Sequence, residues 1–77
     1  MSKLTIIPPI KMVAILVYLG FKEIRQKGSH RFFQHQDGRT TIIPYHKGED
    51  LGRGLIREIL KDIELSIEEY DELRKRV

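Results

Sequence analysis

Apolar residues near the amino terminus recur at helical spacing and predict a helix over residues 9–19. The positions that recur are Ile10, Val13, Leu16 and Val17, which should give the helix an apolar face for a sheet. Pro9 fixes a backbone angle that suits a first helical turn, and Gly20 stands where a C-terminal capping glycine belongs. Residues 1–7 are predicted to form an extended lead-in. Because the rest of this helix is apolar as well, we expect a partner or the C-terminal helix to cover a second side of it.

Beyond the first helix the period changes from helical to alternating, which predicts three strands. They are expected over residues 21–26, 30–36 and 39–45. The dipeptide Asp37-Gly38 favours a tight hairpin between the second and third strands, and Gly28 suits the turn between the first and second. The third strand begins with β-branched residues, while Pro44 restricts it to an edge of the sheet or ends it.

Helical spacing returns after the third strand. A helix is predicted over residues 50–62, with Asp50 as its N-cap. Its apolar stripe consists of Leu55, Ile56, Ile59, Leu60 and Ile63. Gly52 and Gly54 each cost about 1 kcal/mol against alanine in a helix, so we interpret them as positions of close backbone approach.

A capping box formed by Ser66 and Glu69 predicts a short final helix that runs to residue 75. This order of elements predicts a single α+β domain over residues 1–77, a two-layer sandwich in which helices cover one face of a three-stranded antiparallel sheet. A domain of this size buries only about 60% of the surface of its unfolded chain, which leaves little room for a deep pocket. The chain therefore favours a polymer or a protein partner over a small-molecule substrate.

The second predicted strand has a different set of side chains on each side of the sheet. One side receives His30, Phe32 and Gln34, and the other receives Arg31, Phe33 and His35. One phenylalanine should therefore enter the core and the other should stay outside it. An exposed phenylalanine beside basic residues either stacks on a nucleic-acid base or packs under a loop or a partner.

The charge is unevenly distributed along the chain. Residues 1–47 hold eight Lys or Arg against two acidic residues, whereas residues 48–77 hold six against nine, and the whole chain carries +3. This asymmetry favours a basic face for an anionic partner such as nucleic acid. The absence of cysteine excludes disulfides and thiolate zinc sites and fits the cytoplasm. The apolar run over residues 12–19 is too short to span a membrane, which takes about 20 residues.

His30 is the candidate catalytic residue. It follows Gly28-Ser29 at the start of a predicted strand, where an imidazole is held on one side and open to solvent on the other. A group that titrates near neutral pH suits proton transfer there. The alternative is an ordinary surface histidine, which is the commoner role for a lone histidine in a strand.

Further polar residues are candidates for a site around an RNA phosphate. His46 is a possible second catalytic residue, and the candidate RNA-binding residues are Lys27, Ser29, Arg31, Lys47, Arg53 and Arg57. The three histidines form no recognised metal-binding sequence pattern, and no glycine-rich loop ends in the Lys-Ser/Thr of a nucleotide site. We therefore expect no metal and no cofactor. Nothing marks Ser29 as an activated nucleophile.

Four short motifs carry a resemblance to a known family. They are Gly20-Phe21, Arg25-Gln26-Lys27-Gly28-Ser29-His30, Pro44-Tyr45-His46 and Ile56-Arg57-Glu58-Ile59-Leu60. In this order and at these separations, the chain resembles a HicA-type toxin over nearly all of residues 8–73. The resemblance implies a double-stranded-RNA-binding-like fold, metal-independent cleavage of mRNA, and neutralisation by a HicB-type antitoxin. The family's essential histidine falls on His30. The first helix is more apolar than is usual in the family, and residues 50–54 are less rich in lysine.

The chemistry that the resemblance implies requires few groups, because RNA carries its own nucleophile, the 2′-hydroxyl. His30 would remove the hydroxyl proton, and one of Arg31, Lys47 and Arg53 would stabilise the charge that develops on the phosphate. His46 would protonate the leaving 5′-oxygen. Two other functions remain open: a non-catalytic module that binds RNA, and a protein-interaction domain whose first helix docks a partner.

Overall fold

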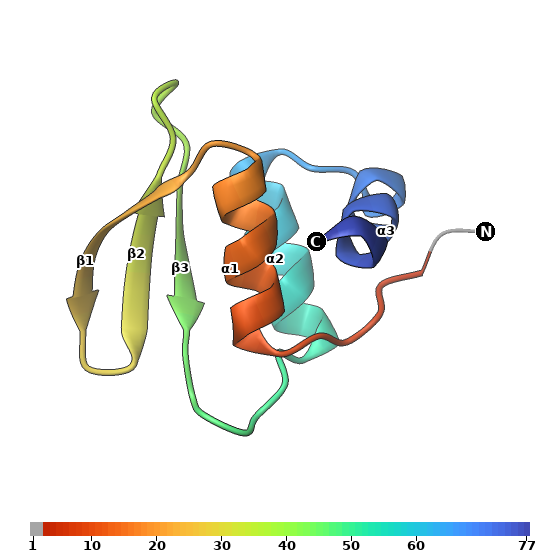
Figure 1. Cartoon of the computed structure of the whole chain (residues 1–77), viewed down its shortest axis with the longest axis horizontal. Helices are drawn as coiled ribbons and strands as arrows, with labels where there is room; N and C mark the ends of the chain where they lie inside the picture. Colours follow the sequence, from red (N-terminus) through yellow and green to blue (C-terminus); the bar gives the residue numbers. More distant parts are fainter. Residues whose placement is uncertain (1–2) are drawn as a thin grey trace.

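The structure, a computed structural model, describes residues 3–77 and confirms the predicted α+β fold. The elements in chain order are α1 (Pro9–Tyr18), β1 (Lys22–Lys27), β2 (His30–Gln34), β3 (Thr40–Pro44), α2 (Arg53–Ile63) and α3 (Ile67–Arg76). Each begins and ends within three residues of its predicted bounds. The three strands form an antiparallel sheet in the order β1-β2-β3, and the helices gather on one side of it (Figure 1). Of the predicted extended lead-in, residues 1 and 2 lie outside the described part of the chain.

The sheet extends beyond the layer of helices. Helices α1 and α2 pack mainly against β3, and every residue of β1 is exposed. Strand β1 contains a bulge at Ile24, so Glu23 pairs with Phe33 while Arg25 pairs with the neighbouring Phe32. Because of the bulge, Glu23 and Arg25 point to opposite faces although they are two residues apart.

The two phenylalanines of β2 divide as predicted. Phe33 is buried, with 1% of its surface exposed, whereas Phe32 is only partly buried on the opposite face. Phe33 joins Ile43 of β3, Ile56 of α2 and Met12 of α1 in one apolar core. Pro44 ends β3, which is an edge strand, as its missing N–H requires.

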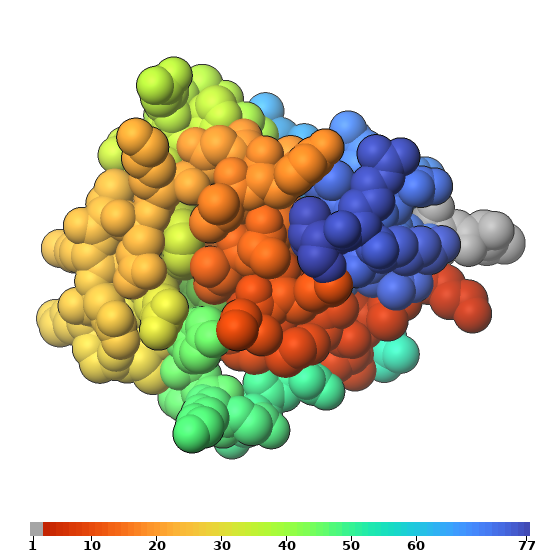
Figure 2. All heavy atoms as spheres, viewed as in Figure 1, coloured from red at the N-terminus to blue at the C-terminus, as the bar shows by residue number. Residues whose placement is uncertain are grey.

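The orientation predicted for α1 is wrong in part. Ile10 and Val17 are 65% and 60% exposed, while Met12 and Ile15 are fully buried together with the predicted Leu16. An apolar period cannot orient a helix that is apolar on nearly all sides, and the core selects one stripe. Figure 2 shows α1 at the surface between the sheet and α3. Helix α3 packs against one side of α1, as expected of the C-terminal helix, but the side that carries Ile10 and Val17 stays exposed.

The predicted N-cap of α2 is also wrong. Gly52, not Asp50, occupies the N-cap position, and no side chain caps the helix. The N–H of Leu51 donates a 2.9 Å hydrogen bond to the carbonyl of Ile7, and this contact between distant segments holds the chain extended past Asp50. A Cβ added at Gly52 or at the next glycine, Gly54, would have no neighbour within 4 Å, so no other described segment of the chain approaches these glycines.

The last helix is built as its sequence predicts. Ser66 Oγ accepts from the Glu69 N–H, and the Glu69 carboxylate accepts from the Ser66 N–H, each at 3.0 Å. Tyr70 is fully buried and donates through its hydroxyl to the carbonyl of Thr5, which fastens α3 to the amino-terminal segment. Over the described residues, no helix has the length and apolar character to cross a bilayer.

Candidate functional site

The candidate catalytic residue lies at one end of the sheet, beside two chain reversals. His30 opens β2, where it pairs with Lys27 of β1 on one side and Pro44 of β3 on the other. Gly28 takes a φ of 58° in the β1–β2 turn, a left-handed conformation that favours glycine. The N–H of Tyr45 donates a 2.6 Å hydrogen bond to the carbonyl of Ser29, so the turn is tied to the chain that leaves β3 (Figure 1).

The ring of His30 is free to meet a substrate. It is exposed, and no hydrogen bond or ion pair to a described residue engages it. His35 provides a contrast, because its Nε2 lies 3.1 Å from the Leu19 carbonyl and its Nδ1 accepts from the Asp37 N–H at 3.1 Å. The His35 ring also packs edge-on against Phe21, with 5.1 Å between centroids. Structural contacts thus occupy both nitrogens of His35, and neither nitrogen of His30.

Arg31 points to the opposite face of the sheet from His30. Its guanidinium carbon lies 4.0 Å from the centre of the Tyr45 ring, and its Nη1 lies 3.9 Å from the Glu23 carboxylate. Its Nε is buried without a hydrogen-bond partner, unlike every other buried side-chain nitrogen or oxygen of the described residues. An unsatisfied buried donor costs about 1–3 kcal/mol, so Arg31 is not placed there for stability alone.

The structure brings most of the predicted site residues to this end of the sheet. Lys27, Ser29, His30 and Arg31 come from the β1–β2 turn and the start of β2, and His46 and Lys47 follow Tyr45 in the loop after β3. His46 and Lys47 are exposed and border one hollow with the acidic Glu49 and Asp50, and His46 borders a second hollow with the same two acids.

Arg53 and Arg57 stand apart from this group. Both are exposed on the first two turns of α2, and no hydrogen bond, ion pair or cation–π contact joins either one to the end of β2.

Two residues of the site region were not predicted. Tyr45 fixes both the Ser29 turn and the Arg31 side chain, and Arg25 lies over the Phe32 ring at 4.4 Å from its centre. The motif Pro44-Tyr45-His46 contains the signal for Tyr45. Arg25 opens the motif Arg25-Gln26-Lys27-Gly28-Ser29-His30, but nothing in the sequence shows that it lies over Phe32, since the bulge that turns it there is a single extra residue in an otherwise regular strand.

No metal site accompanies these residues. The described part of the chain has no group of three or more His, Cys, Asp or Glu side chains that could hold an ion. Away from this end of the sheet, the hydrogen bond that the Arg39 N–H donates to Asp37 lowers the pKa of that carboxyl. At the end of the sheet, Lys27, Arg31 and Lys47 carry positive charge, and Glu49 and Asp50 carry negative charge in the loop after β3.

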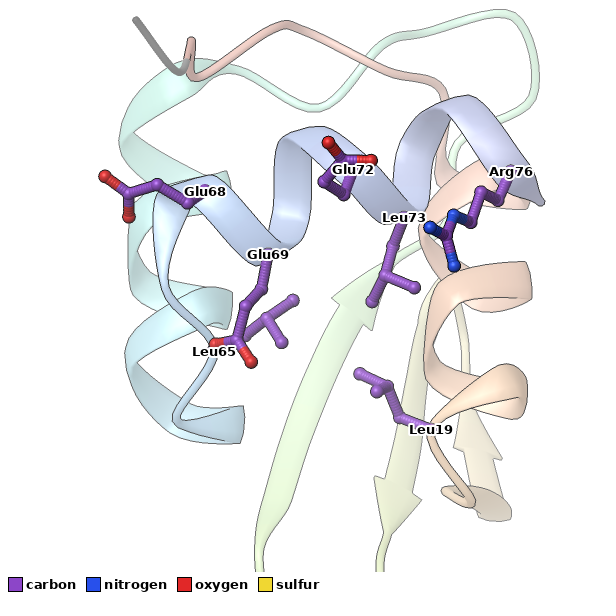
Figure 3. Close-up of a pocket in the computed structure, with 7 residues that line it drawn as sticks. All are labelled: Leu19, Leu65, Glu68, Glu69, Glu72, Leu73 and Arg76. Atoms are coloured by element: carbon purple, nitrogen blue, oxygen red, sulfur yellow. The ribbon is translucent and has the colours of Figure 1, made fainter.

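A separate hollow of about 360 Å³ lies at the far end of α1, between Leu19 and helix α3 (Figure 3). Leucine side chains form its apolar lining, at positions 19, 65 and 73. Its rim carries Glu68, Glu69 and Glu72 with a single cation, Arg76. An acidic rim repels phosphate, so this hollow does not fit an RNA backbone.

Comparison with protein families identifies the family of the chain. The sequence model of a family described as "HicA toxin of bacterial toxin-antitoxin" matches residues 11–65, which is more than half of the chain. The match includes α1 from Lys11 onward, the whole sheet and α2, and it ends before α3. No curated protein matches the chain.

Proposed function

We propose, since the chain belongs to the HicA toxin family of bacterial toxin–antitoxin systems, that it is a metal-independent endoribonuclease that cleaves mRNA. The observation that carries the proposal is the free imidazole of His30, held at a strand end among basic side chains. As a substrate, mRNA would place the protein in the cytoplasm.

The reaction proposed is attack of a 2′-hydroxyl on the adjacent phosphorus. A neutral His30 imidazole takes the hydroxyl proton as the 2′-oxygen bonds to phosphorus, and the bond from phosphorus to the 5′-oxygen breaks. The products are a 2′,3′-cyclic phosphate and a 5′-hydroxyl, which takes up one proton. A positioned general base contributes roughly 10²–10⁴-fold to the rate. His46, in the loop tied to the His30 turn, is the candidate donor of the second proton.

Basic groups at the end of the sheet would hold the RNA backbone. Lys27 and Lys47 are exposed and flexible point charges, whereas Arg31 is held in place by stacking on Tyr45. Lys47 is the proposed stabiliser of the pentavalent phosphate, and Lys27 and Ser29 are the proposed ligands of flanking phosphates. Arg31 points to the face opposite His30 and would contact RNA away from the reacting phosphate. Arg53 and Arg57 would contact RNA that continues past the sheet toward α2.

The toxin family implies an antitoxin partner, and we propose that a HicB-type protein inhibits this chain by covering His30. A basic surface with exposed apolar side chains favours an acidic partner. Lys27 and Arg31 should then lie in the interface. RNA and antitoxin would compete for the same surface.

The second candidate is an RNA-binding module without catalysis. The exposed sheet face supports it, because a basic face with an aromatic side chain binds RNA whether or not cleavage follows. Cleavage of single-stranded RNA in the presence of a chelator, and its loss in His30→Ala with binding retained, separates the two candidates.

A further inference from the structure

The face of the sheet that the helices leave uncovered carries a basic row beside an aromatic ring. The antiparallel register and the bulge in β1 determine which side chains point there. Strand β1 contributes Lys22, Arg25 and Lys27, and β2 contributes His30 and Phe32. The face thus joins the candidate catalytic histidine to an aromatic ring on the same strand.

Phe32 borders a hollow of about 380 Å³ on this face. Ile24 of β1 and Ile42 of β3 lie on either side of it, and they are 55% and 43% exposed. The Thr40 hydroxyl and the Arg25 guanidinium border the same hollow and provide polar groups at its margin. An exposed apolar hollow with a few polar groups at its edge is typical of a binding surface.

The charge of this face favours an anionic ligand. None of the strand residues that point to it is acidic, because the bulge directs Glu23 to the other face, where it lies near Arg31. Arg25 covers Phe32 with 4.4 Å between the guanidinium carbon and the ring centre. Aromatic rings and guanidinium planes are the two protein surfaces on which unpaired RNA bases stack.

The distance along β2 fits one nucleotide. His30 and Phe32 are two residues apart on the same face, which corresponds to roughly 6.6 Å at 3.3 Å per residue. A phosphate at His30 would therefore place a neighbouring base over Phe32 in an extended RNA strand.

We propose that the hollow formed by Ile24, Phe32 and Ile42 binds the base of a nucleotide next to the scissile phosphate, and that the substrate is therefore unpaired RNA. This inference rests on the proposed function, since it takes His30 as the point of cleavage. In a duplex the bases are stacked on one another and their faces are covered, so a duplex could offer its backbone and groove edges to this surface but no base face. The subsite is tolerant of sequence, because every base has a face that stacks.

The test uses His30→Ala as the parent protein, so that RNA is bound and not cleaved. In this parent, Phe32→Leu removes the aromatic face and keeps an apolar side chain, Phe32→Tyr keeps the face, and Val17→Ala is a control on exposed α1. Binding of a labelled single-stranded RNA, and of a duplex with the same sequence, is measured at one fixed salt concentration, with circular dichroism melts in parallel.

We expect Phe32→Leu to weaken single-strand binding by about 5- to 140-fold, the range equivalent to the 1–3 kcal/mol of one stacked base. Phe32→Tyr and Val17→Ala should bind as the parent does, and duplex binding should be the same in all four proteins. Equal single-strand affinity of Phe32→Leu and the parent would overturn the proposal, as would a parent that prefers the duplex. Loss of antitoxin binding alone in Phe32→Leu would also overturn it and assign the hollow to the protein partner. Failure of the wild-type protein to cleave RNA would refute the proposed nuclease without deciding the binding result.

Discussion

The backbone N–H of Tyr45 donates a 2.6 Å hydrogen bond to the carbonyl of Ser29, and this bond joins the two loops at the basic end of the sheet. One loop precedes His30, and the other carries His46 and Lys47. The Tyr45 ring also stacks against the Arg31 guanidinium, so this one residue both joins the two loops and holds the Arg31 side chain in place. The geometry of the site therefore depends on the turn that Gly28 allows.

Substitution of Gly28 should weaken the fold through its backbone alone. Its φ is 58°, and an added Cβ would meet nothing within 4 Å, so Gly28→Ala costs about 1–2 kcal/mol of conformational strain and no steric clash. For a domain of this size, that lowers the melting temperature by about 4–8 °C per kcal/mol. Gly54→Ala, inside α2 and equally open, is the control and should stabilise by about 0.5–1 kcal/mol. A melting temperature unchanged in Gly28→Ala would contradict the left-handed turn.

Two isoleucines of α1 test which side of the helix is buried. Ile15 is fully buried and Ile10 is 65% exposed, so the same substitution should have very different effects. We expect Ile15→Ala to lower the free energy of unfolding by about 2–5 kcal/mol and Ile10→Ala by less than about 0.5 kcal/mol, both measured by urea denaturation. Equal losses in the two variants would mean that α1 is rotated from the orientation described.

The decrease of the free energy of unfolding at alkaline pH should depend on Tyr70. Burial raises the pKa of its hydroxyl from 10.0 to about 12. Below pH 10 the group is protonated in both states; between pH 10 and pH 12 only the unfolded chain releases the proton, so stability falls as pH rises through that interval. The full difference corresponds to roughly 3 kcal/mol.

Tyr70→Phe therefore should lose stability less steeply above pH 10, although it starts about 1 kcal/mol lower at neutral pH because the hydrogen bond to Thr5 is gone. Chemical denaturation at stepped pH values measures both effects. Tyr18→Phe, on the exposed side of α1, is the control and should follow the wild-type curve. Parallel curves for Tyr70→Phe and wild type would show that Tyr70 is not buried as described.

Antitoxin binding should protect His30 from chemical modification. With a HicB-type partner bound, we expect a histidine-modifying reagent to react with His30 far more slowly than in the free protein, as read by peptide mass spectrometry. An unrelated acidic protein of similar charge is the control and should give no protection. Equal modification of His30 in the free and bound proteins would exclude inhibition by masking.

The change of hydrophobic period predicted the order of helices and strands, since both periodicities are properties of neighbouring residues. Contacts between distant segments explain what it missed. The bridge from Ile7 to Leu51 delays the start of α2, and no local pattern reveals it. Orientation of α1 could not be predicted because the helix is apolar on nearly every side, so only packing selects the buried stripe.

In the candidate site too, features set by neighbouring residues could be predicted, and features set by contacts between distant segments could not. His30 could be predicted from its place after a glycine turn and from the family motif, and the structure leaves its ring exposed. The contacts of Arg25 and Arg31 could not be predicted. The contact of Arg25 with its aromatic partner depends on a bulge, and the contact of Arg31 depends on Tyr45, which follows β3. Alternation correctly separated Phe32 from Phe33, since β2 contains no bulge.

Whether His30 acts in RNA cleavage is measured most directly by cleavage of a labelled single-stranded RNA in EDTA. Wild-type protein is compared with His30→Ala and with Gln34→Ala, an exposed residue of the same strand, while RNA binding and thermal melts are recorded in parallel. We predict that wild type and Gln34→Ala cleave in the chelator, and that His30→Ala loses roughly 10²–10⁴-fold in rate while it folds and binds RNA as before. Undiminished cleavage by His30→Ala would remove this residue from the mechanism, and a lowered melting temperature with lost binding would make it a structural residue instead.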